Sequence, residues 1–222
     1  MTSIRMADGV ARIDLDDGKV NAMSSAFMGE IGRALDQAEA AGAVTLIRGR
    51  PGIFSAGFDL GTFKRGREAT LEMLRAGAGL IERLLAFPRP VLTACTGHAY
   101  PMGAFLMLAA DVRFAVSGPW KIGMNEVAIA LTVPRFALEI ARHRLTPAGF
   151  ARITTAAMFG PDEARELGYV DRVVDAARLD AAVQEESARL TQLDLTAYAG
   201  TKARVNERVL AAVRAAIADE LR

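Results

Sequence analysis

Residues 91–116 read VLTACTGHAYPMGAFLMLAADVRFAV, and this stretch decides the fold class. Val91–Ala94 is a short apolar run typical of a buried strand, and Gly103–Ala110 is apolar enough for a buried helix. Val112–Val116 has the pattern of a second buried strand. A strand, a glycine-bearing loop, a helix and another strand in this order predict a layered α/β domain.

The upstream sequence repeats this alternation. Ser3–Met6 and Val10–Leu15 alternate about Asp8-Gly9, which predicts a β-hairpin. A helix, a strand and a second helix are then expected at Ser24–Ala41, Ala43–Ile47 and Arg67–Leu85. Ser24 or Ser25 is expected to cap the first of these helices.

Beyond Pro134 the pattern becomes nearly all helical. Short helices are predicted at Phe136–His143, Pro147–Thr155 and Asp162–Leu167, and long ones at Arg178–Leu190 and Thr196–Leu221. Val170–Val174 is expected to add one last strand. No polar linker separates the two halves, so we expect them to pack as one unit.

Composition excludes several classes of protein. A chain of 222 residues fits one ordinary domain, and 27 basic against 26 acidic residues give no field that attracts nucleic acid. The lone Cys95 excludes an internal disulfide framework. With only His98 and His143 beside it, the sequence also argues against a zinc site of the usual ligands, so we expect no metal. Met1–Asp17 lacks the apolar run of a signal peptide, and Ala99–Ala110 is too short to span a bilayer, so we expect a cytoplasmic protein without membrane partners.

Two loops have the character of main-chain binding sites. In Ile53–Leu60, the small residues Ser55, Ala56 and Gly57 allow a ligand to approach the backbone closely. In Thr96–Ala104, a helix begins after a glycine-bearing loop, where its first N–H groups lack partners and favour negative charge. The plain alternatives are a strand-to-helix turn and a simple helix start.

A third loop, Ile122–Ile129, places Glu126 in an apolar run. A carboxyl group in such surroundings has a raised pKa and suits general acid–base catalysis. The alternative is that the backbone turns Glu126 to solvent, which is the commoner position of a glutamate.

Other candidate catalytic or binding residues have weaker support from the sequence. A hydrolase triad of Ser55, His98 and Asp111 is not excluded by spacing, whereas Cys95 in a buried strand is expected to be a core residue. Basic residues on the last helix, including Lys202, are expected to form a solvated face or to reach a phosphate.

Six segments match one family pattern in the same order along the chain. They are Val20-Asn21-Ala22-Met23, Phe54–Leu60, Pro90–Arg113, Asn125–Pro134, Ala164–Val174 and Thr201-Lys202. Together they resemble the crotonase superfamily, the enoyl-CoA hydratases and isomerases, over nearly the whole chain.

The resemblance implies a spiral of ββα units over residues 1–134, which holds an acyl-CoA site, and a helical, trimerising region over residues 135–222. It implies that the amides of Phe58 and Met102 form an oxyanion hole and that Glu126 is the catalytic acid and base. It also implies a homotrimer or homohexamer, with coenzyme A as part of the substrate and no separate cofactor. The residues implied to contact the acyl-CoA are Ala22, Ser55, Ala56, Gly57, Asp59, Leu60, Gly103 and Phe105.

Phe105 departs from the family pattern. Hydratases carry a second glutamate at this position, and phenylalanine cannot activate water. Glu126 is followed by Pro134 at a spacing similar to that of the Δ3,Δ2-enoyl-CoA isomerases, which need a single base. We therefore expect an isomerase, with Phe105 and residues of segment 61–80 walling an apolar acyl pocket.

Two alternatives stay open at this point. A hydratase or lyase could take its second acid from Asp59 or Glu72. An acyl-CoA-binding protein without turnover would be favoured if Met102 crowded its loop. Trimer formation is also expected from C-terminal apolar faces that a monomer would leave uncovered, made by Leu179, Ala182, Val183, Val205, Val209, Val213 and Ile217.

Overall fold

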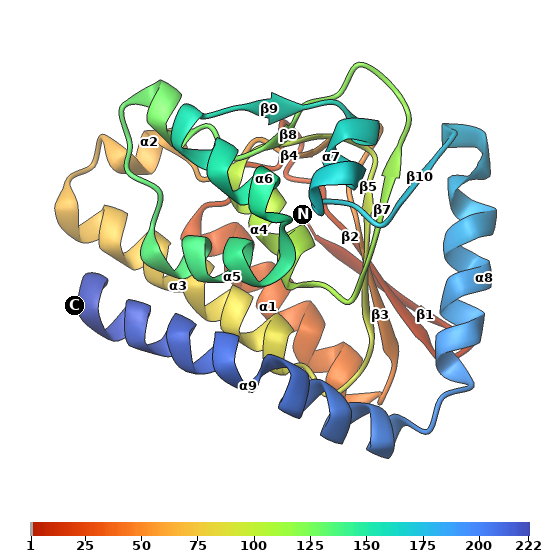
Figure 1. The fold of residues 1–222 in the computed structure, drawn as a ribbon. Coiled ribbons are helices and arrows are strands. Elements are labelled where there is room, and N and C mark those ends of the chain that lie inside the picture. Colours follow the sequence, from red (N-terminus) through yellow and green to blue (C-terminus); the bar gives the residue numbers. More distant parts are fainter. Residues whose placement is uncertain (1) are drawn as a thin grey trace.

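The computed structural model describes residues 2–222 and contains two sheets (Figure 1). The larger sheet has the strand order β1-β2-β3-β5-β7-β10, and the smaller one has the order β4-β6-β8-β9. The strands are β1 (Ser3–Ala7), β2 (Val10–Asp14), β3 (Val44–Arg48), β4 (Gly52–Ser55), β5 (Val91–Cys95), β6 (Gly97–Ala99), β7 (Val112–Val116), β8 (Ile122–Gly123), β9 (Met158–Phe159) and β10 (Arg172–Val174).

Helices cover the sheets and make up most of the C-terminal part. The α-helices are α1 (Ser25–Ala40), α2 (Leu60–Phe63), α3 (Arg67–Ala86), α4 (Pro101–Ala109), α5 (Arg135–Arg144), α6 (Pro147–Ala151), α7 (Pro161–Leu167), α8 (Leu179–Thr191) and α9 (Leu195–Glu220). Short 3₁₀ helices are η1 (Glu126–Ile129), η2 (Arg152–Thr155) and η3 (Ala176–Arg178).

The two sheets are built from a repeated strand–strand–helix unit. In each unit the first strand (β3, β5 or β7) joins the larger sheet, and the next strand (β4, β6 or β8) joins the smaller one. The strands of successive units pair in parallel, as in Leu46↔Leu92 and Ala94↔Phe114 of the larger sheet. This arrangement is the expected spiral of ββα units and confirms the predicted fold.

The N-terminal hairpin and the first helix form for the predicted local reasons. Asp8 and Gly9 have φ angles of 50° and 74°, the left-handed pair that a two-residue hairpin turn requires. Ser24 caps α1 by accepting a hydrogen bond from the Phe27 N–H at 3.2 Å. These contacts fix the start of the spiral against β3 through parallel pairing with β2.

The central strands of the larger sheet, β3, β5 and β7, are buried on both faces. Val44, Leu46 and Phe114 belong to a cluster that also contains Leu179 and Val183 of α8. On the opposite face, α1, α3 and α4 contribute to the main core, and α9 packs along α3 and α5 (Figure 1). A sheet with apolar side chains on both faces needs cover on both, which explains why the C-terminal helices return to the sheet.

The apolar faces of the last two helices are largely covered within one chain. Val183, Val209 and Val213 are buried, whereas Val205 is 61% exposed. The expectation that a monomer leaves these faces uncovered was therefore wrong except at Val205, because α8 packs on the sheet and α9 on its neighbouring helices. Trimer formation itself stays a prediction.

The smaller sheet had no counterpart in the predicted elements. Its strands are two to four residues long, too short for an alternating pattern to be recognised. Residues beyond 134 complete both sheets, since β9 pairs with β8 and β10 pairs with β7. The division of the chain at residue 134 stays a prediction. Among residues 2–222, no helix is long and apolar enough to cross a membrane.

We expect Gly97→Ala to unfold the small sheet, with Gly200→Ala as the matched control. A Cβ at residue 97 would lie 1.9 Å from the carbonyl carbon of Gly52, so β4 and β6 would have to separate. The loss should exceed about 3 kcal/mol. A Cβ at Gly200 in α9 would meet no atom within 4 Å beyond the neighbouring backbone of its own helix, and alanine there should stabilise by about 0.5–1 kcal/mol. Urea unfolding of both variants checks this, and equal midpoints would contradict it.

Candidate active site

The connection between β4 and α2 presents one main-chain N–H without a partner. Gly57 has a φ of 87°, and its N–H donates to Ser55 Oγ at 3.0 Å. On either side of Phe58, the Gly57 carbonyl accepts from Met23 N–H and the Asp59 N–H donates to the Met23 carbonyl, at 2.8 and 3.4 Å. Within residues 2–222 no group accepts from the Phe58 N–H, so a ligand can.

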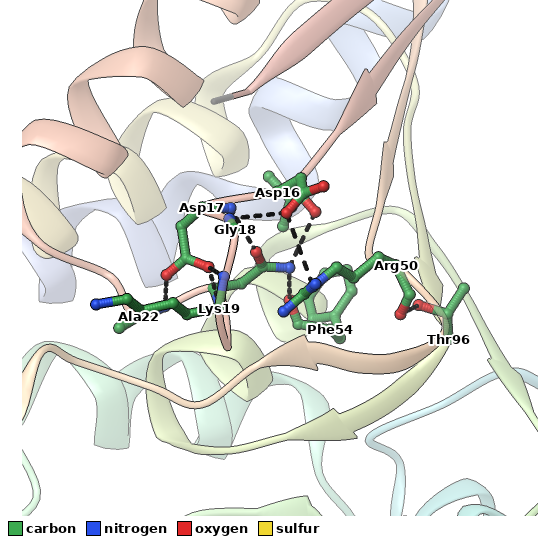
Figure 2. Close-up of polar contacts among 10 residues, drawn as sticks. Asp16, Asp17, Gly18, Lys19, Ala22, Arg50, Phe54 and Thr96 are labelled. Carbon is green, nitrogen blue, oxygen red and sulfur yellow. Dashed lines mark hydrogen bonds and ion pairs between the residues drawn. The ribbon is translucent and has the colours of Figure 1, made fainter.

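A polar network beneath this loop holds it in place (Figure 2). The Asn21 side chain donates to the Phe54 carbonyl at 3.1 Å, and the Asn21 carbonyl accepts from Ser55 Oγ at 2.7 Å. The Asp17 carboxylate accepts from the N–H groups of Asn21 and Ala22 at 2.8 and 2.9 Å. Asn21 has a φ of 53°, and these bonds offset the cost of that conformation.

The start of α4 presents a second unpartnered N–H. Pro101 is the first residue of the helix, and Tyr100 before it forms no side-chain cap. The Ala104 N–H bonds the Tyr100 carbonyl at 3.0 Å, whereas no group in the described chain accepts from the Met102 N–H. The Met102 amide is therefore free at the positive end of a buried helix.

Close main-chain contact brings the two loops together. A Cβ on Gly57 would lie 3.3 Å from Pro101 Cδ, and a Cβ on Gly103 would lie 2.8 Å from Ser55 Cβ. Side chains at these two glycines would separate the loops. The sequence predicted that small residues let a ligand approach the backbone of the first loop. In the structure, glycines in the two loops let one loop approach the other.

The side chains of Phe58 and Met102 both pack against α3. A Cβ on Gly77 would lie 2.8 Å from the Phe58 ring and 3.2 Å from Met102 Sδ. Met102 is fully buried and does not line the neighbouring cavity. Crowding of the loop by Met102, the sign of a protein without turnover, is therefore not found.

A cavity of about 450 Å³ adjoins the two loops and is walled mainly by apolar groups. It is lined by Ala56, Phe58, Leu60, Phe63, Thr70, Leu74, Tyr100, Pro101, Asn125, Glu126, Ile129, Leu131, Thr132 and Pro134. Its size and its few polar groups are those of a small-molecule site. Both loops and Glu126 thus meet at one cavity.

Glu126 is buried, with 4% of its surface exposed, and begins η1. Neither carboxylate oxygen has a hydrogen-bond partner among residues 2–222. Burial raises the pKa of Glu126 to about 7, although a bond to its own backbone opposes the shift. The alternative of a solvent-facing glutamate is wrong for this residue, whereas its neighbours Val127 and Ile129 are exposed.

The other predicted contact residues divide into two groups. Ala56 and Leu60 line the cavity. Five others do not line it: Ala22, Ser55, Gly57, Asp59 and Gly103. Asp59 instead caps α2 by accepting from the Gly61 N–H. Phe105 is also absent from the lining. It is fully buried, and its ring centroid lies 6.3 Å from that of Phe58.

Sequence reasoning missed two polar residues of the cavity wall. Asn125 and Tyr100 line it, and their side chains form no hydrogen bond within the described residues. Both precede a helix without capping it, which is unusual for asparagine. The position of Asn125 directly before Glu126 was the one available signal.

The alternative constellations are not assembled. Ser55 is engaged by the backbone, His98 Nδ1 accepts from the Lys121 N–H, and Asp111 pairs with Lys202 at 2.7 Å, so no hydrolase triad forms. Burial raises the pKa of Cys95 to about 12. Lys202 is buried in its ion pair, so the expectation of a solvated or phosphate-binding lysine was wrong for this residue.

Comparison with known proteins points to one family. The family model described as enoyl-CoA hydratase/isomerase matches residues 5–222. A probable enoyl-CoA hydratase of Bacillus subtilis is 30% identical over 76% of this chain and 67% of its own length. A Pseudomonas syringae protein of the same family superposes with a TM-score of 0.97 and 39% identity, covering 99% and 96% of the two chains. An enoyl-CoA isomerase of Mycobacterium tuberculosis gives 0.93 and 36%, covering 98% and 96%.

The buried Glu126 should make stability depend on pH. Its pKa rises from 4.5 to about 7 on folding, so between these values the folded chain holds a proton that the unfolded chain has lost. The stabilisation that this arrangement gives the folded state is fully present below pH 4.5 and is lost as pH rises through 7. The free energy of unfolding should fall by up to about 3 kcal/mol over this range. Unfolding free energies at pH 5 and 8 should therefore differ less in Glu126→Gln than in the parent. Glu68→Gln, at an exposed position, is the control, and identical pH profiles for all three proteins would contradict the assignment.

Proposed function

We propose that this chain, which belongs to the enoyl-CoA hydratase/isomerase family, shifts the double bond of an enoyl-CoA thioester from C3 to C2. The observation that carries the proposal is that Glu126 is the one carboxylate among the residues lining the cavity. A double-bond shift needs a single base that first removes and then returns a proton. One carboxylate in a cavity that adjoins the two loops with free amides supports this reaction.

The chemistry follows from where negative charge develops. When Glu126 removes a proton from C2 of a 3-enoyl thioester, the carbonyl oxygen becomes an oxyanion. The N–H groups of Phe58 and Met102 would donate to it, and each well-aimed donor stabilises such a charge by about 2.7–4 kcal/mol. Return of the proton at C4 then gives the 2-enoyl thioester, and a pKa of about 7 suits both transfers.

A hydratase reaction needs a second group to activate water, and the two candidates lie outside the cavity. Asp59 and Glu72 line a separate polar hollow with Ser24 and Arg65. The Asp59 carboxylate also accepts from the Thr62 hydroxyl at 2.7 Å. The positions of these two carboxylates therefore do not support either of them as the second acid of a hydratase.

Hydration is nevertheless the second candidate, because one observation favours it. The side chains of Asn125 and Tyr100 line the cavity without hydrogen-bond partners among residues 2–222 and could hold a water molecule near Glu126. The relatives carry both names, hydratase and isomerase. An amide and a neutral phenol position water but take up its proton poorly, so hydration should be the slower reaction.

Glu126→Gln tests the proposed reaction. It keeps the shape of the side chain and removes the base, so isomerisation of a 3-enoyl-CoA should fall at least about 10³-fold, within the range for a base that acts in both steps. Affinity for the thioester should change little. Mass spectrometry and ultraviolet detection of the 2-enoyl product measure the rate, and calorimetry measures binding.

The unmodified protein decides between the two reactions. It should hydrate a 2-enoyl-CoA more slowly than it isomerises a 3-enoyl-CoA, by orders of magnitude. Rapid formation of 3-hydroxyacyl-CoA would favour the hydratase, and full isomerase activity in Glu126→Gln would show that another group is the base. Thioester binding without either product would indicate a protein that binds without turnover.

Assembly into a trimer or hexamer remains part of the proposal and rests on the family resemblance. Light scattering at micromolar concentration should give three or six times the chain mass of 23.7 kDa. A mass near 24 kDa would contradict it.

A further inference from the structure

We propose that the preferred substrates are long-chain acyl thioesters, whose distal carbons leave the cavity between Leu60 and Ile129 and lie on an apolar rim. This inference rests on the proposed acyl-CoA function and adds the substrate class to it. It depends on the shape of the cavity rather than on the reaction at Glu126.

Most of the cavity wall is apolar. Its polar side chains include Glu126 and Asn125, and Phe58 and Pro101 of the two loops with free amides also line it. The remaining wall is formed by α2, α3 and the segment after η1, through Phe63, Leu74 and Leu131. Thr70 belongs to this wall too, and its hydroxyl is already used in a bond to the Gly66 carbonyl at 2.9 Å. A hydrocarbon chain fits such a wall, whereas a polar or charged acyl group would lose its hydration without gaining partners.

The apolar part does not end inside the protein. Leu60 and Ile129 both line the cavity, and they are 54% and 42% exposed. They come from different elements, α2 and η1, and each combines a place in the wall of one apolar cavity with exposure to solvent. Single exposed apolar residues are ordinary on a protein surface, but two that continue the wall of a cavity to the outside extend its apolar surface.

Hydrogen bonds hold both rim residues in place. Leu60 is the first residue of α2, which Asp59 caps through the Gly61 N–H at 3.0 Å. Ile129 ends η1, where Ala130 adopts a φ of 60° and the Leu131 N–H bonds the Glu126 carbonyl at 3.0 Å. The opening is thus built by the same backbone that places the base.

The rim gives a quantitative expectation. A methylene group that becomes fully buried raises affinity about four-fold, so one that rests on a half-exposed rim should raise it about two-fold. Affinity should therefore continue to increase with chain length after the cavity is full. A closed cavity would show the opposite, a sharp loss once the chain exceeds its length.

Binding of saturated acyl-CoA thioesters of different chain length, which the proposed reaction cannot convert, tests the proposal without relying on turnover. Saturated butanoyl-, octanoyl- and hexadecanoyl-CoA are titrated by calorimetry, below their micelle concentrations, into the full chain and into Leu60→Ser and Ile129→Ser. Val127→Ser is the matched control, because Val127 lies in η1 and is 49% exposed but does not line the cavity. Thermal unfolding verifies that all variants are folded, as expected for exposed positions.

We expect hexadecanoyl-CoA to bind tightest. Each rim variant should weaken its binding about five-fold, change butanoyl-CoA binding less than two-fold, and differ from Val127→Ser, which should change neither. Tightest binding of butanoyl-CoA would overturn the proposal. Equal losses for all three ligands would also overturn it, by showing that the rim holds the coenzyme A arm. If isomerisation is absent but the chain-length series holds, the proposed reaction fails and the substrate class stands.

Discussion

Close contact between the main chains of successive ββα units is the constraint on which the rest of the structure depends. Where β4 meets β6, Gly97 leaves no room for a Cβ against Gly52. One step further along, Gly103 faces Ser55 in the same way, and Gly57 faces Pro101. At these contacts the two segments lie so close together that no side chain fits between them. The close contact also brings the two loops with free amides to one cavity.

Glu126 differs from the other buried charged side chains because it has no partner in the described chain. The three other charged side chains that are buried in the described chain are paired: Lys202 with Asp111, Arg113 with Asp171, and Glu186 with Arg172 and Arg189. Such pairs recover through hydrogen bonds what burial costs. Glu126 has no such partner in the described chain, so its charged form is destabilised by burial. An unpaired carboxyl group in a wall of apolar side chains is costly for stability and useful for moving protons at neutral pH.

Sequence patterns were sufficient where an element is long. The helices α1, α3, α8 and α9 lie within one or two residues of their predicted bounds, because periodic apolar faces and caps specify them. The short strands of the small sheet were missed, because their pairing depends on contacts distant in sequence. Every residue of α4 is buried, so no apolar periodicity could show that Phe105 packs on Phe58 instead of lining the cavity. The burial of Glu126 depends on the 3₁₀ turn of η1, for which the sequence has no recognised signal.

The ion pair between Lys202 and Asp111 joins positions 91 residues apart and ties the last helix to the end of α4. That helix also packs along α3, which walls the cavity, and along α5, which follows Pro134. Because synthesis runs from the N-terminus, the strands of both sheets, the last of which is β10, are made before α9, which supports the binding wall. During synthesis the chain carries an apolar cavity that is not yet supported. A nascent protein of this design is most exposed to aggregation, and most dependent on chaperones, in the interval before residues 195–220 emerge and pack as α9.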